Sequence, residues 1–238
     1  MTLDFNTLRS SLELIETIEK ATLRMVIQGI YDFASEARQI FIGERDLVAD
    51  IGEDITREAL DRLGTSIIPV RLFGKIDYKR ARYVFHPDHS VRQALFVDSK
   101  AEKIEGARTA TIQTAQTSMK IRQWRASKAI DEAGGLPLSL QLQGNDYLVT
   151  TIFVKYNYRE IQDTNELVNI SVTCLPNGML QERYNPTAED TFWLVGRNAP
   201  SRGEVFRVRI SLPRLKSKAN WRVQTIHVMP SLSYHWDN

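Results

Sequence analysis

The stretch Ala-Leu-Phe-Val-Asp-Ser-Lys at residues 94–100 ends an apolar run with an acid, a serine and a lysine. Alternate residues of a β-strand point to the same face of a sheet, so Asp98 and Lys100 would project together. A second strand-like stretch, residues 72–77, ends at Asp77. If Asp77 lies on a neighbouring strand, two carboxylates and one ammonium converge. Such a group is the minimum needed to hold Mg²⁺ and a water beside a phosphodiester.

This Asp-x-Lys pattern has two interpretations. In the first, the carboxylates are metal ligands, and Lys100 orients or deprotonates the attacking water and offsets developing negative charge. In the second, the strand simply ends in solvent, and Asp98 and Lys100 form an incidental surface ion pair. The motif alone does not separate the two.

Length and composition indicate an ordinary globular chain. Its 238 residues, 42% of them hydrophobic, suit one sizeable α/β or α+β domain, so we expect a single domain over residues 1–238. No apolar run approaches the length of about 18 residues needed to cross a membrane. The amino terminus has neither a basic segment nor an apolar one after it, and Cys174 is the only cysteine. These features predict an intracellular protein without disulfides.

The net charge of +2 is small, but basic residues are concentrated in three segments, 71–82, 120–128 and 202–222. Much of the compensating acid lies in the first 70 residues. Such asymmetry predicts a basic surface that faces a polyanion such as nucleic acid. The alternative is that these segments are the solvated faces of basic strands.

The first part of the chain has helical patterning. Apolar residues recur every three or four positions over residues 12–41, which predicts a helix ended by Gly43. A second helix is expected over residues 55–63, with Asp54 as its amino-terminal cap and Gly64 just after its end.

Strand character follows. The pattern predicts strands over residues 70–77, 80–85, 91–100, 148–158, 167–175, 205–212 and 221–229. Between the third and fourth of these, residues 105–118 are rich in Thr and Gln and short of bulky apolar side chains. We expect that segment to be a loop or an irregular helix.

Several short segments together resemble a known family. They are residues 53–56, 76–80, 96–101, 150–154, 158–160, 183–186 and 202–205. In this order they are similar to blocks of the SfiI-type type II restriction endonucleases, which belong to the PD-(D/E)xK nuclease superfamily. Each block is short, but together they span most of the chain.

The resemblance implies an α/β fold with a restriction-endonuclease-like core, in which a mixed β-sheet is flanked by helices. The active site would lie at the ends of adjacent strands. Asp77 matches the first acidic ligand, Asp98 the second, and Lys100 the catalytic lysine. The backbone carbonyl of Ser99 would be the third metal ligand, and Glu53 is a possible additional acid.

The resemblance also identifies candidate DNA-binding residues, namely Arg108, Arg202, Arg207 and Arg209. Arginine can pair with O6 and N7 of guanine together, and arginines at i and i+2 of a strand face the same way. The family therefore points to a GC-rich interrupted palindrome with GGCC-like half-sites, GGCCNNNNNGGCC as the first guess. Alternatively, these arginines bind phosphates or pair with acids such as Glu204.

The implied activity is Mg²⁺-dependent, sequence-specific cleavage of double-stranded DNA by water, which leaves 5′-phosphate ends. The implied assembly is a homotetramer, with a dimer as the alternative, in a bacterial cytoplasm that also holds a cognate DNA methyltransferase. Two other functions stay open. One is a catalytically silent, sequence-specific DNA-binding protein derived from such a nuclease, and the other is a nuclease without sequence preference.

Overall fold

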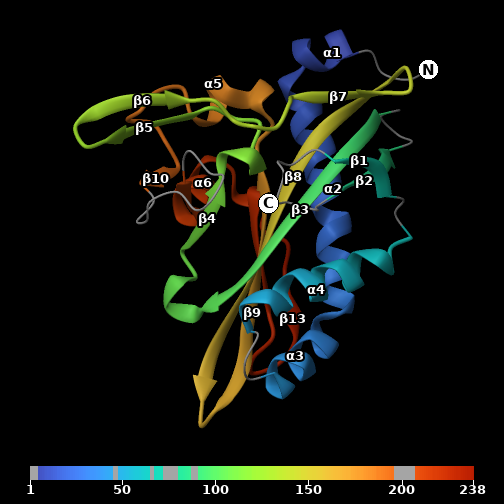
Figure 1. The fold of residues 1–238 in the computed structure, drawn as a ribbon, viewed down its shortest axis with the longest axis vertical. Coiled ribbons are helices and arrows are strands. Elements are labelled where there is room, and N and C mark those ends of the chain that lie inside the picture. Colours follow the sequence, from blue (N-terminus) through green and yellow to red (C-terminus); the bar gives the residue numbers. More distant parts are fainter. Residues whose placement is uncertain (1–4, 45–47, 65–66, 72–79, 87–90, 196–206) are drawn as a thin grey trace.

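The amino-terminal part of the chain is helical. The computed structural model describes residues 5–44, 48–64, 67–71, 80–86, 91–195 and 207–238 (Figure 1). The first four helices are α1 (Phe5–Ser10), α2 (Leu12–Asp32), α3 (Ala34–Gly43) and α4 (Val48–Asp61). Among the described residues, no helix has both the length and the apolar character needed to cross a membrane.

The helices differ from expectation at two points. The helix predicted over residues 12–41 is broken at Phe33, whose φ of −98° and ψ of 0° interrupt the α-helical path, although α3 does end at Gly43. Asp54 lies inside α4 and pairs with Arg57 at 3.0 Å, so its prediction as a cap is wrong. The reason is that Ile51 is buried like the later apolar residues of α4, so the helix continues upstream through Gly52.

The main sheet is mixed and has the order β1-β2-β3-β8-β9-β12-β13, with β7 also paired to β8. Its strands are β1 (Ile67–Arg71), β2 (Arg80–His86), β3 (Val91–Lys103), β7 (Ser139–Leu142), β8 (Asn145–Ile161), β9 (Thr164–Leu175), β12 (Val223–His227) and β13 (Ser233–Tyr234). Among the strand pairs of this sheet that the structure describes, β3 and β8 run parallel and the others are antiparallel. The expected mixed α/β architecture is therefore confirmed.

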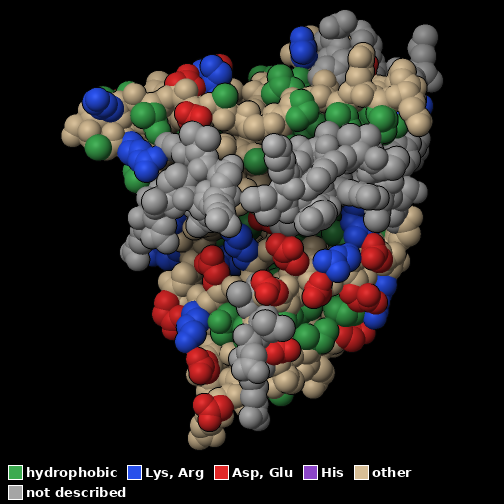
Figure 2. All heavy atoms as spheres, viewed as in Figure 1, with side chains coloured by type: hydrophobic (Ala, Val, Ile, Leu, Met, Phe, Trp, Pro, Cys, Tyr) green, Lys and Arg blue, Asp and Glu red, His purple; other side chains and the backbone are tan. Residues whose placement is uncertain are grey.

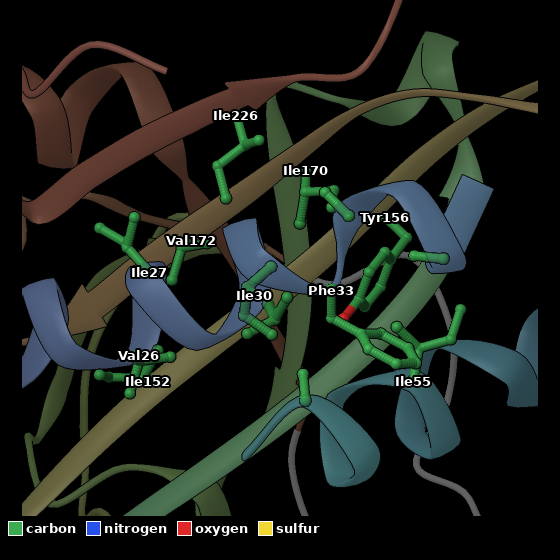
Figure 3. Packing of buried hydrophobic residues seen from close by; sticks show 14 of the residues in the cluster. Val26, Ile27, Ile30, Phe33, Ile55, Ile152, Tyr156, Ile170, Val172 and Ile226 are labelled. Carbon is green, nitrogen blue, oxygen red and sulfur yellow. The ribbon is translucent and has the colours of Figure 1, made fainter. Parts of the chain in front are cut away.

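The central strand β3 has two different faces. Leu95, Val97 and Ala101 belong to the core that also contains Ile152 and Tyr156 of β8 and side chains of α2, α3 and α4. Figure 3 shows this packing of the helices on the sheet. Because side chains alternate along a strand, Asp98 and Lys100 project from the opposite face.

A smaller sheet lies beyond that opposite face and has the order β10-β11-β4. Its strands are β10 (Trp193–Val195), β11 (Arg207–Ser211) and β4 (Thr109–Gln113), and α6 (Leu212–Lys218) follows β11. Strand β4 contradicts the expected loop or irregular helix at residues 109–113, whereas the 3₁₀ turns at 104–106 and 114–116 agree with it. Only Ala110 and Ile112 of β4 enter the core, so the apolar signal was too short to reveal a strand.

The remaining elements complete the edges of the molecule. They are the hairpin of β5 (Ile121–Arg125) and β6 (Lys128–Glu132), helix α5 (Gln181–Tyr184), and the 3₁₀ turns η2 (Ile104–Gly106), η3 (Thr114–Gln116), η4 (Gly178–Leu180) and η5 (Asn220–Arg222). In Figure 1 the β5–β6 hairpin extends away from the main sheet.

Candidate active site

Strand β3 carries the proposed catalytic residues into the interior. Asp98 is only 4% exposed and Ser99 3% exposed, while Lys100 is partly buried. The described pairing of β2 with β3 covers Val91 to Leu95, and Asp98 follows three residues later in β3. A buried carboxylate needs compensating positive charge or hydrogen bonds. Asp98 is therefore no solvated strand end, and the surface ion-pair interpretation is wrong for it.

Lys100 reaches from the main sheet to the smaller one. Its Nζ donates a hydrogen bond of 2.8 Å to the backbone carbonyl of Thr111, in β4. In the parallel register of β3 and β8, Asp98 is opposite Phe153 and Lys100 is opposite Lys155. Asp98 and Lys100 are thus brought to one face, as the i, i+2 spacing predicted.

Helix α4 contacts β3 at the site itself. A Cβ atom added at Gly52 would lie 3.0 Å from the backbone N of Ala101 and 3.0 Å from the backbone C of Lys100. Glycine allows this close approach because it has no side chain. Glu53, the possible additional acid, is exposed and directly follows the contact. Because it follows the contact of α4 with the backbone of β3, Glu53 stays a candidate.

Two predicted site residues, Asp77 and Arg202, lie outside the described residues. Within the described part of the chain, no three His, Cys, Asp or Glu side chains come together as a metal site. The described donors of the predicted site are the Asp98 carboxylate and the Ser99 carbonyl, and the complete ligand set stays a prediction.

The predicted recognition strand has the expected alternation. Val208 and Ile210 of β11 are fully buried, while Arg209 is partly exposed and its Nε donates to the Val195 carbonyl at 3.2 Å. The backbone of Arg207 is opposite that of Gln113 in β4.

Arg108 lies beside the same sheet. It is exposed and precedes β4, and its backbone carbonyl accepts a hydrogen bond of 3.1 Å from the Leu212 amide. The fold therefore places Arg108 close to the end of β11, although the two are far apart in the sequence.

Part of the basic charge found in the sequence is neutralised within the chain. Arg122 contacts Asp131 and Glu182, at 3.3 Å and 2.8 Å. Lys216 pairs with Asp237, and Lys218 pairs with Asp190. Figure 2 likewise shows acidic and basic side chains interspersed on the face it presents. These basic residues contribute less to a polyanion-binding surface than their number suggests.

Comparison with known proteins decides the family. The family model for "Type II restriction enzyme SfiI" matches residues 15–226. The chain belongs to the SfiI family of type II restriction enzymes. Type II restriction enzyme SfiI of Streptomyces fimbriatus is 35% identical over 239 residues, which cover 94% of this chain and 88% of that enzyme. The family expected from the short sequence blocks is thus confirmed.

Solved structures agree with this assignment to the SfiI family. The crystal structure of tetrameric restriction endonuclease SfiI bound to cognate DNA matches with a TM-score of 0.85 and 34% identity, over 99% of this chain and 93% of that one. The restriction endonuclease BglI bound to its DNA recognition sequence matches with a TM-score of 0.75 over 93% of each chain. At 18% identity, the BglI match bears on the fold alone.

Sequence reasoning missed one residue of this region of the SfiI-family fold. Lys155 is fully buried in the central strand β8, beside Lys100. A usable signal was present, because a lysine within an apolar central strand must find several hydrogen-bond acceptors.

Proposed function

We propose that this type II restriction enzyme cuts both strands of DNA at an interrupted GC-rich palindrome with GGCC-like half-sites and requires Mg²⁺. The observation that carries the proposal is the pair of Asp98 and Lys100 on one face of β3, with the Asp98 carboxylate buried. Water would attack the phosphorus, the bond from phosphorus to the 3′ oxygen would break, and that oxygen would take up a proton. The products are 5′-phosphate and 3′-hydroxyl ends.

The donor set fits a hard cation. The buried Asp98 carboxylate, the Ser99 carbonyl and the Asp77 carboxylate are oxygen ligands of the kind that Mg²⁺ takes. Bound there, Mg²⁺ supplies Lewis-acid polarisation of the phosphate and lowers the pKa of a water. Lys100 orients or deprotonates the attacking water, and Glu53 assists as an additional acid.

Recognition is proposed for the arginines on and beside the smaller sheet. Arg207 and Arg209 alternate with buried residues along β11, as two readers of neighbouring bases require. Arg108 adjoins this strand, and Arg202 precedes it in the sequence. We expect Arg209→Ala to cost about 1–3 kcal/mol at one base position and to relax discrimination there. A uniform loss over all DNA sequences would instead make Arg209 a phosphate contact.

We further propose that the chain works as a single-domain subunit of a homotetramer, with a dimer as the alternative. The support is the match to tetrameric SfiI over 99% of this chain. Sedimentation with and without DNA distinguishes the two assemblies. A cognate methyltransferase and a bacterial cytoplasmic location complete the proposal, since unprotected host DNA would otherwise be cut.

The decisive experiment digests a fully sequenced DNA that contains paired GGCC half-sites, with Mg²⁺ and with EDTA, and sequences the ends. Discrete Mg²⁺-dependent fragments support the proposal and give the site and the stagger. A smear would indicate a nuclease without sequence preference. DNA left intact across a range of Mg²⁺ and Mn²⁺ concentrations would favour the silent binding protein.

One variant tests the site. Lys100→Ala should lower the cleavage rate by about 10²–10⁴-fold while site-specific binding is kept. The matched control is Lys103→Ala, which removes an exposed lysine of the same strand that pairs with Glu160. Unchanged cleavage by Lys100→Ala would remove that residue from the mechanism.

A further inference from the structure

Among the described residues near the predicted site, Lys155 is a completely buried cation. Its side chain is fully buried, and its Nζ contacts the Glu102 carboxylate at 2.6 Å, the Gly106 carbonyl at 2.6 Å and the Thr109 carbonyl at 2.5 Å. These are three acceptors, which match the three donors of an ammonium group. Glu102 lies on β3, and Gly106 and Thr109 lie on the segment that leads from β3 into β4.

The two neighbouring lysines bind the same edge of β4. Lys100 donates to the Thr111 carbonyl, and Lys155 donates to the Thr109 carbonyl. Carbonyl groups two residues apart in a strand point to the same side. Strand β4 is the last strand of its sheet, and its other edge pairs with β11. The main sheet therefore holds β4 by its outer edge through one lysine from β3 and one from β8.

The register extends this connection to the predicted base readers. Thr111, which accepts the hydrogen bond from Lys100, is directly opposite Arg209 in the pairing of β4 with β11. One cross-strand step thus separates the catalytic lysine from a predicted reader of DNA bases. A shift of β11 would therefore reach both lysine contacts through its pairing with β4.

Packing alone does not explain a lysine at position 155. An apolar side chain would fill a buried position without the cost of desolvating a charge, and buried ion pairs often bring no net stability. Burial lowers the pKa of Lys155, and the neighbouring Glu102 opposes that change. Unlike an apolar side chain, the lysine makes directional hydrogen bonds, which hold three acceptors from β3, η2 and β4 around a single atom.

We propose that Lys155 is a positioning residue that fixes β4 on the catalytic strand, and so couples base recognition by β11 to the placement of Lys100. This inference rests on the proposed roles of Lys100 and Arg209. Lys155 itself touches neither the DNA nor the metal in this scheme.

The test compares Lys155→Met and Glu102→Gln with the wild type and with Lys103→Met as the matched control. Lys103 is exposed, is the last residue of the same strand and pairs with Glu160. For each variant, three quantities are measured, namely the Kd for the cognate site, the single-turnover cleavage rate there, and that rate on sites changed at one base. Thermal unfolding shows whether each variant is folded.

We expect Lys155→Met to bind the cognate site almost as tightly as the wild type and to cleave it about 100-fold more slowly. A small misplacement of a catalytic group lowers the reaction rate by about this factor. The ratio of cleavage rates on cognate and one-base-changed sites should fall by about tenfold, because recognition no longer sets the position of Lys100. Glu102→Gln should show the same pattern more weakly, and Lys103→Met should behave as the wild type.

Wild-type cleavage rates and discrimination in both Lys155→Met and Glu102→Gln would overturn the inference. So would an equal loss of binding and cleavage, since that is the mark of a purely structural residue. If Lys155→Met does not fold, Glu102→Gln decides, because it keeps the lysine and weakens only its charge partner. The proposed function fails separately, through undiminished cleavage by Lys100→Ala.

Discussion

Two buried cations occupy different parts of the molecule, Arg222 in the framework and Lys155 beside the site. Both side chains are fully buried and both contact a carboxylate. Arg222 binds Glu19 at 2.7 Å, and Glu19 is itself fully buried. The guanidinium of Arg222 also lies 4.2 Å from the centre of the Tyr184 ring and 4.3 Å from that of the Trp221 ring. Lys155 instead has a partner, Glu102, that is 35% exposed.

The difference lies in what each cation connects. Glu19 of α2 accepts hydrogen bonds from Arg222 and from the backbone amide of Asn177, which joins a helix to two segments distant in the sequence. Lys155 connects the main sheet to the strand beside the predicted base readers. Although both cations are fully buried, we expect Arg222 to contribute to stability and Lys155 to contribute to cleavage. Losing Arg222 should affect folding, whereas losing Lys155 should affect cleavage.

The largest effect is expected for Arg222→Met, which leaves Glu19 as an uncompensated buried charge. We expect the free energy of unfolding to fall by about 3–5 kcal/mol, measured by urea unfolding. The control Arg159→Met breaks an exposed pair with Glu166 and should cost under about 1 kcal/mol.

A double variant tests the origin of that loss. Glu19→Gln with Arg222→Met removes both charges and keeps an acceptor for the Asn177 amide, so it should recover part of the stability. A single-variant cost as small as that of Arg159→Met would contradict the framework role of Arg222.

An intermediate effect is expected for Gly52→Ala. Gly52 of α4 contacts β3 on the face opposite to Asp98 and Lys100. The added Cβ would lie 3.0 Å from the backbone of β3 and 3.2 Å from Cδ2 of Tyr156, so α4 must shift. We expect a loss of about 1–3 kcal/mol in the free energy of unfolding. The cleavage rate should fall as well, because the shift is at Lys100.

The control for this substitution is Gly43→Ala at the end of α3, where no atom lies within 4 Å of the added Cβ. It should leave cleavage unchanged. Equal cleavage by the two alanine variants would show that the contact of α4 with β3 is not needed for catalysis.

The smallest effect concerns alkaline pH, where only one of the two cations titrates. Burial opposes the charge on Arg222, but Glu19 and its other neighbours raise its pKa above the ordinary arginine value. Burial lowers the pKa of Lys155 below the ordinary lysine value of 10.5, although Glu102 opposes this. The pKa of Lys155 is lower in the folded protein than in the unfolded chain. At pH values between these two, the unfolded chain binds more protons than the folded protein. The free energy of unfolding therefore rises with pH in that window.

Relative to Lys155→Met, the wild type should therefore gain stability as the pH rises towards 10.5. Urea unfolding from neutral pH upward measures the difference between the two proteins. A difference that stays flat, or falls, would contradict the lowered pKa of Lys155. Arg222→Met should show no comparable change relative to the wild type.

Much of the fold was predictable because its central strands carry strong local signals. Strands β3 and β8 contain long apolar runs, and Val208 and Ile210 alternate with arginines in β11. The break at Phe33 was not predictable from glycine or proline, since neither is present there. Strand β4 was missed because only two of its side chains, Ala110 and Ile112, enter the core, which is too short an apolar pattern to indicate a strand.

The shared face of Asp98 and Lys100 was predictable because both residues lie in one segment. Asp98 and Lys100 are two residues apart, so the strand period alone placed them together. The position of Lys155 beside Lys100 could not be predicted from local spacing, because it depends on the parallel register of β3 and β8. That register joins segments far apart in the chain, and no local pattern encodes it.

The acceptors on β4 and the turn before it have a consequence for how specificity can change over evolution. Gly106, Thr109 and Thr111 all accept lysine hydrogen bonds through main-chain carbonyls. Substituting the side chains of Thr109 and Thr111 removes no atom of these contacts. The side chains at these two positions can therefore change while the main-chain contacts to Lys100 and Lys155 persist. On the proposed roles of β11 and Lys100, new recognition sites would then arise without any change at the proposed catalytic residues.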